Sequence, residues 1–161
     1  MALNDTLRSS PAALAALLAL ALGPAGWAAA QSEGGLYIAG AEFSFKTAAE
    51  RGLAQNPRGQ RFFVLALPPE SAALTTSATR AQVRLRERVL AANGVLMVCR
   101  RDLDNGRIAA QRLAPGVVAV RGWPAQGVHE MSPGQRHFAG EDPAPLPASN
   151  EALRRLRSAC S

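Results

Sequence analysis

The chain has 161 residues, of which 48% are hydrophobic and 5% aromatic, and its formal net charge is +6. This length predicts one domain. Nearly all of the positive charge is arginine, since Lys46 is the only lysine. No aromatic side chains alternate with the arginines, as a stacking platform for nucleic acid requires. The charge therefore indicates a solvated basic surface, and we expect no nucleic-acid partner.

Residues 1–30 resemble a secretory signal peptide. A weakly basic start precedes an unbroken Ala/Leu run, Ala12–Leu22, and a small-residue cleavage site, Ala28–Ala30. The alternative is an uncleaved amino-terminal anchor. No later segment is long and apolar enough to span a bilayer. We therefore expect residues 31–161 to be periplasmic or secreted, free of the membrane, with their cysteines in an oxidising compartment.

Apolar runs alternate with amphipathic segments along residues 31–161. Ser44 is expected to cap the first helix, and Thr76 or Ser77 the second. The Pro- and Gly-rich segment 125–148 predicts irregular structure. In chain order, we expect a strand at 36–40, a helix at 45–55, a strand at 61–67, a helical turn at 70–74, a helix at 76–92, a strand at 95–98, a short helix at 107–113, a strand at 117–120 and a helix at 150–158.

This alternation of strands and helices predicts an α/β fold. Apolar strands separated by amphipathic helices form parallel sheets that are covered on both faces. We expect a small three-layer domain with a mostly parallel sheet of four to five strands. Right-handed crossovers would make it doubly wound.

The stretch from Gly94 to Asp102 is the most informative one for function. Four apolar residues deliver Cys99 to the carboxyl end of a buried strand, and a polar run that we expect to be a loop follows. Ligands and chemistry gather at the carboxyl ends of strands in open α/β sheets. Because neighbouring residues of a strand point to opposite faces, Arg101 rather than Arg100 is the expected neighbour of the thiol.

Residues 89–121, VLAANGVLMVCRRDLDNGRIAAQRLAPGVVAVR, resemble the second half of the DsrE/DsrF-like sulfur-relay family. The shared order is a helix, a glycine, an apolar strand ending in cysteine, a short helix, Pro-Gly and a Val-rich strand. The resemblance implies a DsrE-like fold, a persulfide carried on Cys99, a sulfur or thiol donor or acceptor protein as partner, and a small homo-oligomer. The export signal, segment 125–148 and Cys160 depart from the family pattern.

Three roles for Cys99 follow from these observations. It can be a reactive thiol, with its thiolate stabilised by Arg101 and Cys160 as partner thiol. It can form a disulfide with Cys160, which would stabilise the fold by about 4 kcal/mol in the loop-entropy model. It can also be a buried, inert cysteine.

Other candidate residues add little chemistry. Glu42 and Ser44 follow the first strand and are expected to line the same cleft as Cys99, with Trp123 as a wall. Their loop lacks the Gly-rich spacing of a nucleotide cradle. His129 and His137 have no tight metal-ligand spacing and are taken as surface residues, so we expect neither a metal nor a cofactor.

The sequence therefore predicts an exported DsrE-like protein that handles sulfur or thiol redox chemistry through Cys99. The alternative is a non-catalytic binding or assembly module stapled by a Cys99–Cys160 disulfide. Whether the protein is an enzyme stays open at this point.

Overall fold

The computed structural model describes residues 35–57, 59–124 and 135–161. The predicted signal peptide, residues 1–30, lies outside these ranges, as do His129 and the first part of segment 125–148. Within the described ranges, no helix is long and apolar enough to cross a membrane.

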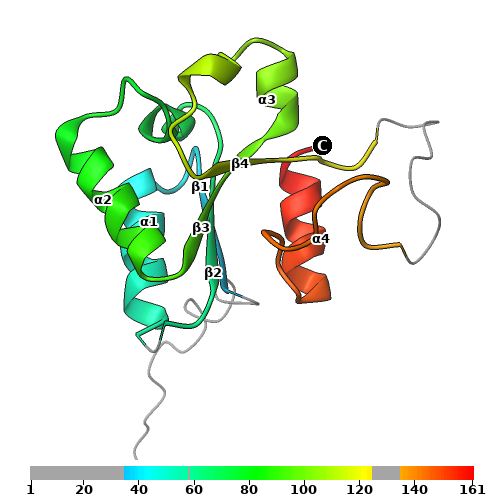
Figure 1. Ribbon diagram of the computed structural model, residues 1–161, viewed down its shortest axis with the longest axis horizontal. Helices are drawn as coiled ribbons and strands as arrows, with labels where there is room; N and C mark the ends of the chain where they lie inside the picture. Colours follow the sequence, from blue (N-terminus) through cyan, green and yellow to red (C-terminus); the bar gives the residue numbers. More distant parts are fainter. Residues whose placement is uncertain (1–34, 58, 125–134) are drawn as a thin grey trace, which may run out of the picture.

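Four parallel strands form one sheet, in the spatial order in which they occur along the chain (Figure 1). The α/β fold class with an all-parallel sheet is therefore confirmed. The central strands are buried at every position, because both faces of the sheet are covered. Such strands read as continuous apolar runs in the sequence. The strands are β1 (Leu36–Ala39), β2 (Phe62–Ala66), β3 (Gly94–Cys99) and β4 (Val117–Val120).

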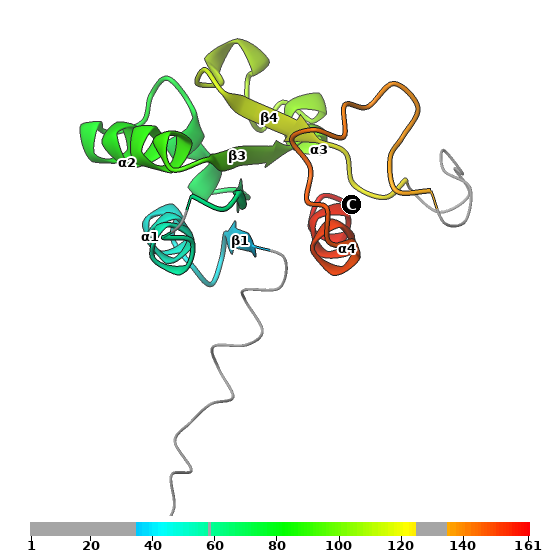
Figure 2. The ribbon, with the colours of Figure 1, turned by 60° about the horizontal axis from the view of Figure 1, so that its bottom comes forward.

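The strand order does not reverse, so the expectation of a doubly wound sheet was wrong. Right-handed crossovers that all advance in one direction leave their connections on one face of the sheet. Accordingly α1 (Phe45–Gln55) and α2 (Arg80–Ala91) lie side by side on one face, whereas α4 (Asn150–Ala159) packs on the other (Figure 2). The third layer thus comes from the chain that follows β4.

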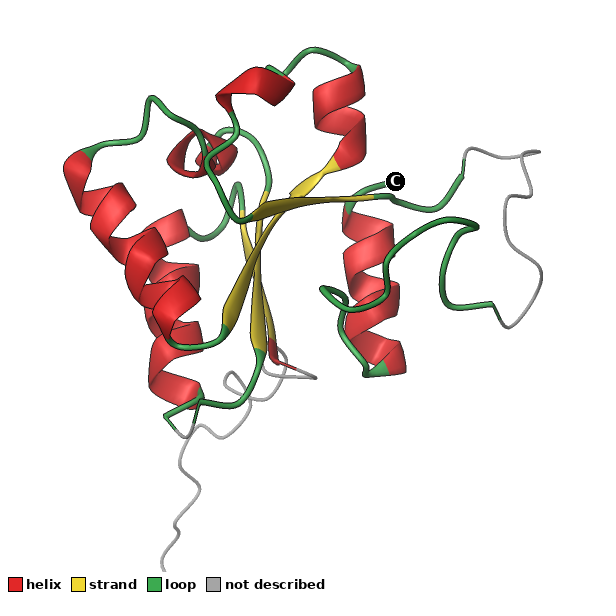
Figure 3. Ribbon diagram, in the orientation of Figure 1, coloured by secondary structure: helices red, strands yellow, loops and turns green. Residues whose placement is uncertain are grey.

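Two apolar clusters fill the space on either side of the sheet. Successive residues of a strand point to opposite faces, so each strand contributes alternate side chains to each cluster. Met97 and Cys99 share the face that α4 covers. Figure 3 shows that the described part of the connection to α4 is loop, and Leu146 from this loop joins the same cluster.

Several element boundaries differ from the sequence expectation. Helix α2 begins at Arg80, because Thr79 forms a capping box in which its hydroxyl accepts from the Gln82 amide at 3.3 Å. The predicted loop after Cys99 is the short helix α3 (Arg100–Asp104).

Two further expectations concern the remaining turns and caps. The helix expected at 107–113 is only a 3₁₀ turn, η4 (Ala110–Arg112), and a second such turn, η3 (Glu70–Leu74), lies where a helical turn was expected. Ser44 caps α1 as predicted, accepting from the Thr47 amide at 3.1 Å.

Replacement of Gly94 by alanine tests the packing of α2 on the sheet. A Cβ at this position would lie 2.5 Å from Val89 Cγ1 and 2.8 Å from the Val89 carbonyl oxygen. Overpacking of this kind costs about 1–3 kcal/mol, so we expect Gly94→Ala to lower the free energy of unfolding by that amount in a urea titration. Gly40→Ala is the matched control, because its Cβ would meet only ordinary contacts from 3.5 Å. Equal stability of the two variants would contradict the described packing.

Candidate functional site

A disulfide joins the carboxyl end of β3 to the end of α4. Cys99 and Cys160 are bonded, with their Cα atoms 5.1 Å apart. The Cys99 side chain is fully buried and Cys160 is 2% exposed. The sequence contains two cysteines, so this bond occupies both of its thiols. Of the roles considered for Cys99, the structure shows the disulfide.

The apolar face of α4 places Cys160 against the sheet. Leu153, Leu156 and Cys160 follow one another at intervals of three and four residues, which puts them on one helical face. All three side chains are buried in the cluster that also holds Met97 and Cys99. The alternation of side chains along β3 places Cys99 on this face of the sheet, and the spacing of buried residues along α4 places Cys160 against it.

Arg157 is a second tie between α4 and its surroundings. Its side chain is fully buried, and its Nη1 donates to Glu141 Oε1 at 2.7 Å while Nη2 bonds the other carboxylate oxygen. Nη1 also donates to the Arg121 carbonyl at 3.0 Å, and Nη2 to the Arg136 carbonyl at 3.1 Å. The guanidinium lies 4.7 Å from the centre of the Phe138 ring. One side chain thus connects α4 to the end of β4 and to the loop before the helix.

The sequence reasoning did not identify Arg157. The available signal was an arginine beside Leu156, on a helix whose buried positions include Ala152 and Leu153. An arginine next to such a face needs a carboxylate partner.

The end of β4 runs directly against the end of α4. A Cβ on Gly122 would lie 2.1 Å from the carbonyl carbon of Cys160, so only glycine allows this approach. The next residue continues the contact, because the Trp123 amide donates to Ser161 Oγ at 2.9 Å. The disulfide, Arg157 and this backbone contact therefore hold the same helix end.

A basic hollow of about 490 Å³ adjoins the disulfide. Arg101 lies on its wall, and its Nη2 donates to the Ala159 carbonyl at 3.1 Å. The same carbonyl oxygen is 3.8 Å from Cys99 Sγ. Trp123, which is 39% exposed, also lines the hollow. The structure therefore brings together Cys99, Cys160, Arg101 and Trp123 at one end of the sheet.

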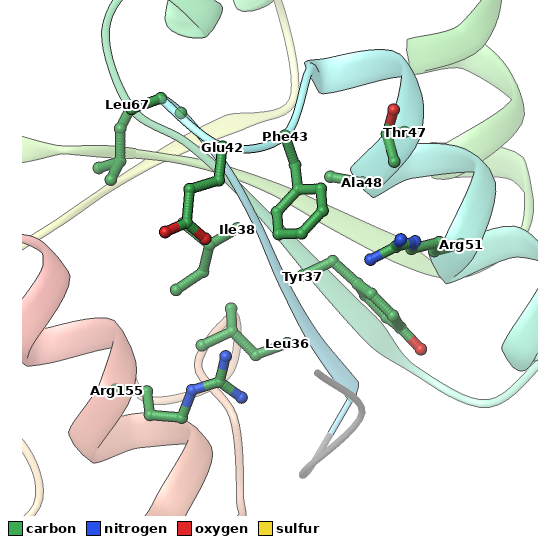
Figure 4. Close-up of a pocket in the computed structure, with 12 residues that line it drawn as sticks. Leu36, Tyr37, Ile38, Glu42, Phe43, Thr47, Ala48, Arg51, Leu67 and Arg155 are labelled. Atoms are coloured by element: carbon green, nitrogen blue, oxygen red, sulfur yellow. The ribbon is translucent and has the colours of Figure 1, made fainter. Parts of the chain in front are cut away.

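Glu42 and Ser44 lie elsewhere. Glu42 lines a separate hollow of about 380 Å³ at the β1 edge of the sheet, whose lining contains neither cysteine (Figure 4). Ser44 is engaged as the cap of α1. The strand order explains this separation, since β2 lies between β1 and β3. His137 is half-buried, and the described part of the chain brings no three metal-ligating side chains together.

Comparisons with family models, with curated proteins and with solved structures find no match for this chain. What the structure has in common with the expectation from the DsrE/DsrF-like resemblance is an α/β domain with a parallel four-stranded sheet.

Removal of the disulfide tests its contribution to stability. The bond joins cysteines 61 positions apart in the sequence, for which the loop-entropy model gives about 4 kcal/mol. We expect the double variant Cys99→Ala/Cys160→Ala to lose about that much free energy of unfolding in a denaturant titration. The wild type should lose a similar amount when a reductant is present throughout, whereas the double variant should not respond to reductant. A reductant-sensitive double variant would contradict this account.

Acid should weaken the Arg157–Glu141 pair. Burial alone raises the pKa of the Glu141 carboxyl, but the hydrogen bond and charge of Arg157 outweigh burial and hold it below its ordinary value of 4.5. A carboxyl with a lowered pKa stabilises the folded state above pH 4.5, and this stabilisation is lost as the pH falls through the lower folded value. We expect Glu141→Gln to lower the melting temperature at neutral pH and to converge with the wild type in acid.

The control for this titration is Glu151→Gln, which removes a partly exposed carboxylate paired with Arg154 on α4. An exposed pair contributes little to stability. If the melting temperature of Glu141→Gln differs from that of the wild type by the same amount at every pH, the role assigned to the buried pair is refuted.

Proposed function

We propose that this chain is an exported, non-catalytic binding or assembly module whose disulfide is structural. The observation that carries the proposal is the burial of Cys99 inside a bond to Cys160. A sulfur carrier needs an accessible thiolate, because the thiolate is the nucleophile. Here the sulfur lies in an apolar cluster between β3 and α4. A disulfide of this kind also accords with export, since such bonds persist in oxidising compartments.

The role of the disulfide follows from the part of the structure that it holds in place, which is α4 on the sheet. Helix α4 and the loop before it are the described cover of one face of the sheet. A binding module keeps its surface preorganised, and fixing the cover rigidly reduces the entropy lost when a partner binds. The bond, the Arg157 pair and the Gly122 contact all act on this one attachment.

Thiol redox chemistry in a divergent DsrE-like protein is the second candidate. It is favoured by the basic hollow, which is lined by Cys160 and Arg101. In this function a thiolate of a donor protein attacks Cys160 Sγ and forms a mixed disulfide. The Cys99–Cys160 bond breaks, and Cys99 leaves as a thiolate, stabilised by Arg101.

Thiol trapping on protein taken from the cell envelope distinguishes the two functions. We expect alkylation before reduction to leave both cysteines unlabelled, and mass spectrometry to find their peptides joined. Protein that is reduced in denaturant before alkylation is the control, in which both cysteines should be labelled. A substantial fraction of labelled or persulfidated Cys99 in the first sample would favour the redox function and overturn the structural one.

The reactivity of the disulfide in the folded protein gives a second test that distinguishes the two functions. A buried structural disulfide resists thiol reductants until the protein unfolds. We expect glutathione to leave the native bond intact and to open it once denaturant is added. Rapid reduction under native conditions, slowed by Arg101→Gln, would support the redox function.

A further inference from the structure

The outer edge of β1 is an unpaired side of the sheet among the described residues. β1 pairs with β2 on one side, and no strand within 35–57, 59–124 or 135–161 lies on the other. The Ala39 carbonyl accepts from the Leu67 amide at 2.9 Å, so Ala39 faces β2. In a parallel ladder the direction alternates from residue to residue. The N–H and C=O groups of Leu36 and Ile38 therefore point away from the sheet.

A groove of about 380 Å³ runs along this edge. Figure 4 shows β1 as its floor, where Ile38 is half-buried and Leu36 and Tyr37 are buried. One wall comes from α1 and the loop before it, and the opposite wall from α4, through Arg155. The groove therefore combines the outward N–H and C=O groups of β1 with a largely apolar lining, which extends over both faces of the sheet. Extended peptides bind proteins in such a setting, by adding a strand to the exposed edge.

Arginines stand on both walls of the groove. Arg51 of α1 lies 4.7 Å from the centre of the Phe43 ring, which fixes its guanidinium against that wall. On the other wall, Arg155 Nη1 is buried and meets no acceptor among the described residues. A buried N–H without an acceptor is costly, and a carboxylate brought by a ligand would supply one. Glu42 is the acidic residue in the lining.

We propose that this groove binds an extended acidic segment of a partner protein, which adds to the sheet as a strand beside β1. This inference rests on the proposed binding function and gives it a site. Adjacent residues of an added strand point to opposite faces. Two neighbouring carboxylates therefore reach Arg51 on the α1 side and Arg155 on the α4 side, whereas carboxylates two residues apart reach only one wall. The net charge of +6 attracts such a segment from a distance.

A second copy of this chain fits the groove less well. It would bring the same two arginines to an edge that already carries them, and like charges across an interface oppose association. The partner that the groove matches is instead acidic, apolar at alternate positions and extended.

The test uses the oxidised protein and a fluorescein-labelled peptide of valine and threonine with two adjacent aspartates at its centre. We expect saturable binding by fluorescence anisotropy. The affinity should fall about tenfold when both aspartates are replaced by asparagine, or when they are moved two residues apart. In amide exchange measured by NMR, the peptide should newly protect the outward N–H of Ile38, which is half-buried in the free protein. Absence of binding, or binding without this protection, overturns the proposal.

Matched variants place the peptide in the groove. Arg155→Gln should weaken binding about tenfold, whereas Arg154→Gln should not, because Arg154 is on the same helix, 70% exposed and outside the groove lining. Ile38→Pro removes an outward amide without touching the pairing to β2, so it should abolish binding, while Ile38→Val should keep it. If Ile38→Pro fails to fold by circular dichroism, the arginine pair decides alone. Equal affinities of the two arginine variants overturn the proposal.

Two other outcomes also overturn it. Protection of the Ile38 amide without peptide, rising with protein concentration, would identify a second copy as the occupant. Such protection at every concentration would identify another part of the same chain. Mass spectrometry of the same sample keeps the two proposals distinguishable. A free Cys99 thiol with bound peptide defeats only the structural role of the disulfide, and an intact disulfide without binding defeats only the groove.

Discussion

The attachment of α4 to the sheet is the constraint on which the rest of the structure depends. The strand order leaves all crossover connections on one face, so the described cover of the other face comes from chain that follows β4. Buried apolar side chains of all four strands, Leu36 and Val120 among them, lie on that second face. A single helix of ten residues supplies most of the cover that the described residues provide. Short helices are marginal alone and depend on tertiary contacts, which here include a covalent bond and a buried ion pair.

These contacts differ in kind, and each limits a different motion. The disulfide fixes the carboxyl end of α4 to β3 and constrains the unfolded chain as well. The Arg157 pair instead orders the irregular loop before the helix, since it reaches Glu141 and the Arg136 carbonyl. A buried pair of this type costs more when one partner is removed than it contributes as a whole. Its value therefore lies in selecting one position for the loop.

The sequence was sufficient for the elements whose determinants are local. Continuous apolar runs located the strands, and Ser44 located the start of α1, because buried strands and helix caps require particular residue types. The start of α2 was missed since Thr76, Ser77 and Thr79 are all acceptable caps, and only the reciprocal bond with Gln82 selects Thr79. The strand order was missed because right-handed crossovers are compatible with a winding that reverses and with one that does not.

The candidate site shows the same limit. The alternation of side chains along β3 and the spacing of apolar residues along α4 allow Cys99 and Cys160 to pair. Whether they form a disulfide or stay as thiols depends on which face of the sheet α4 covers. Glu42 was assigned to the same cleft as Cys99 on the assumption that carboxyl ends of strands converge. With β2 between them, Glu42 lines the hollow beside β1, whereas Cys99 is buried and only its partner Cys160 lines the other hollow.

The order of the strands also explains why β1 offers a surface for recognition. It leaves β1 at an edge, and proteins commonly protect such edges by keeping them short and placing charges beside them. β1 has four residues and is flanked by Arg51 and Arg155. These two arginines repel those of an identical copy yet attract an acidic chain. Since Arg155 is on α4, the attachment of that helix sets both the cover of the sheet and the shape of the groove. A change that loosens the Cys99–Cys160 end of α4 therefore also alters the position of Arg155 in the groove beside β1.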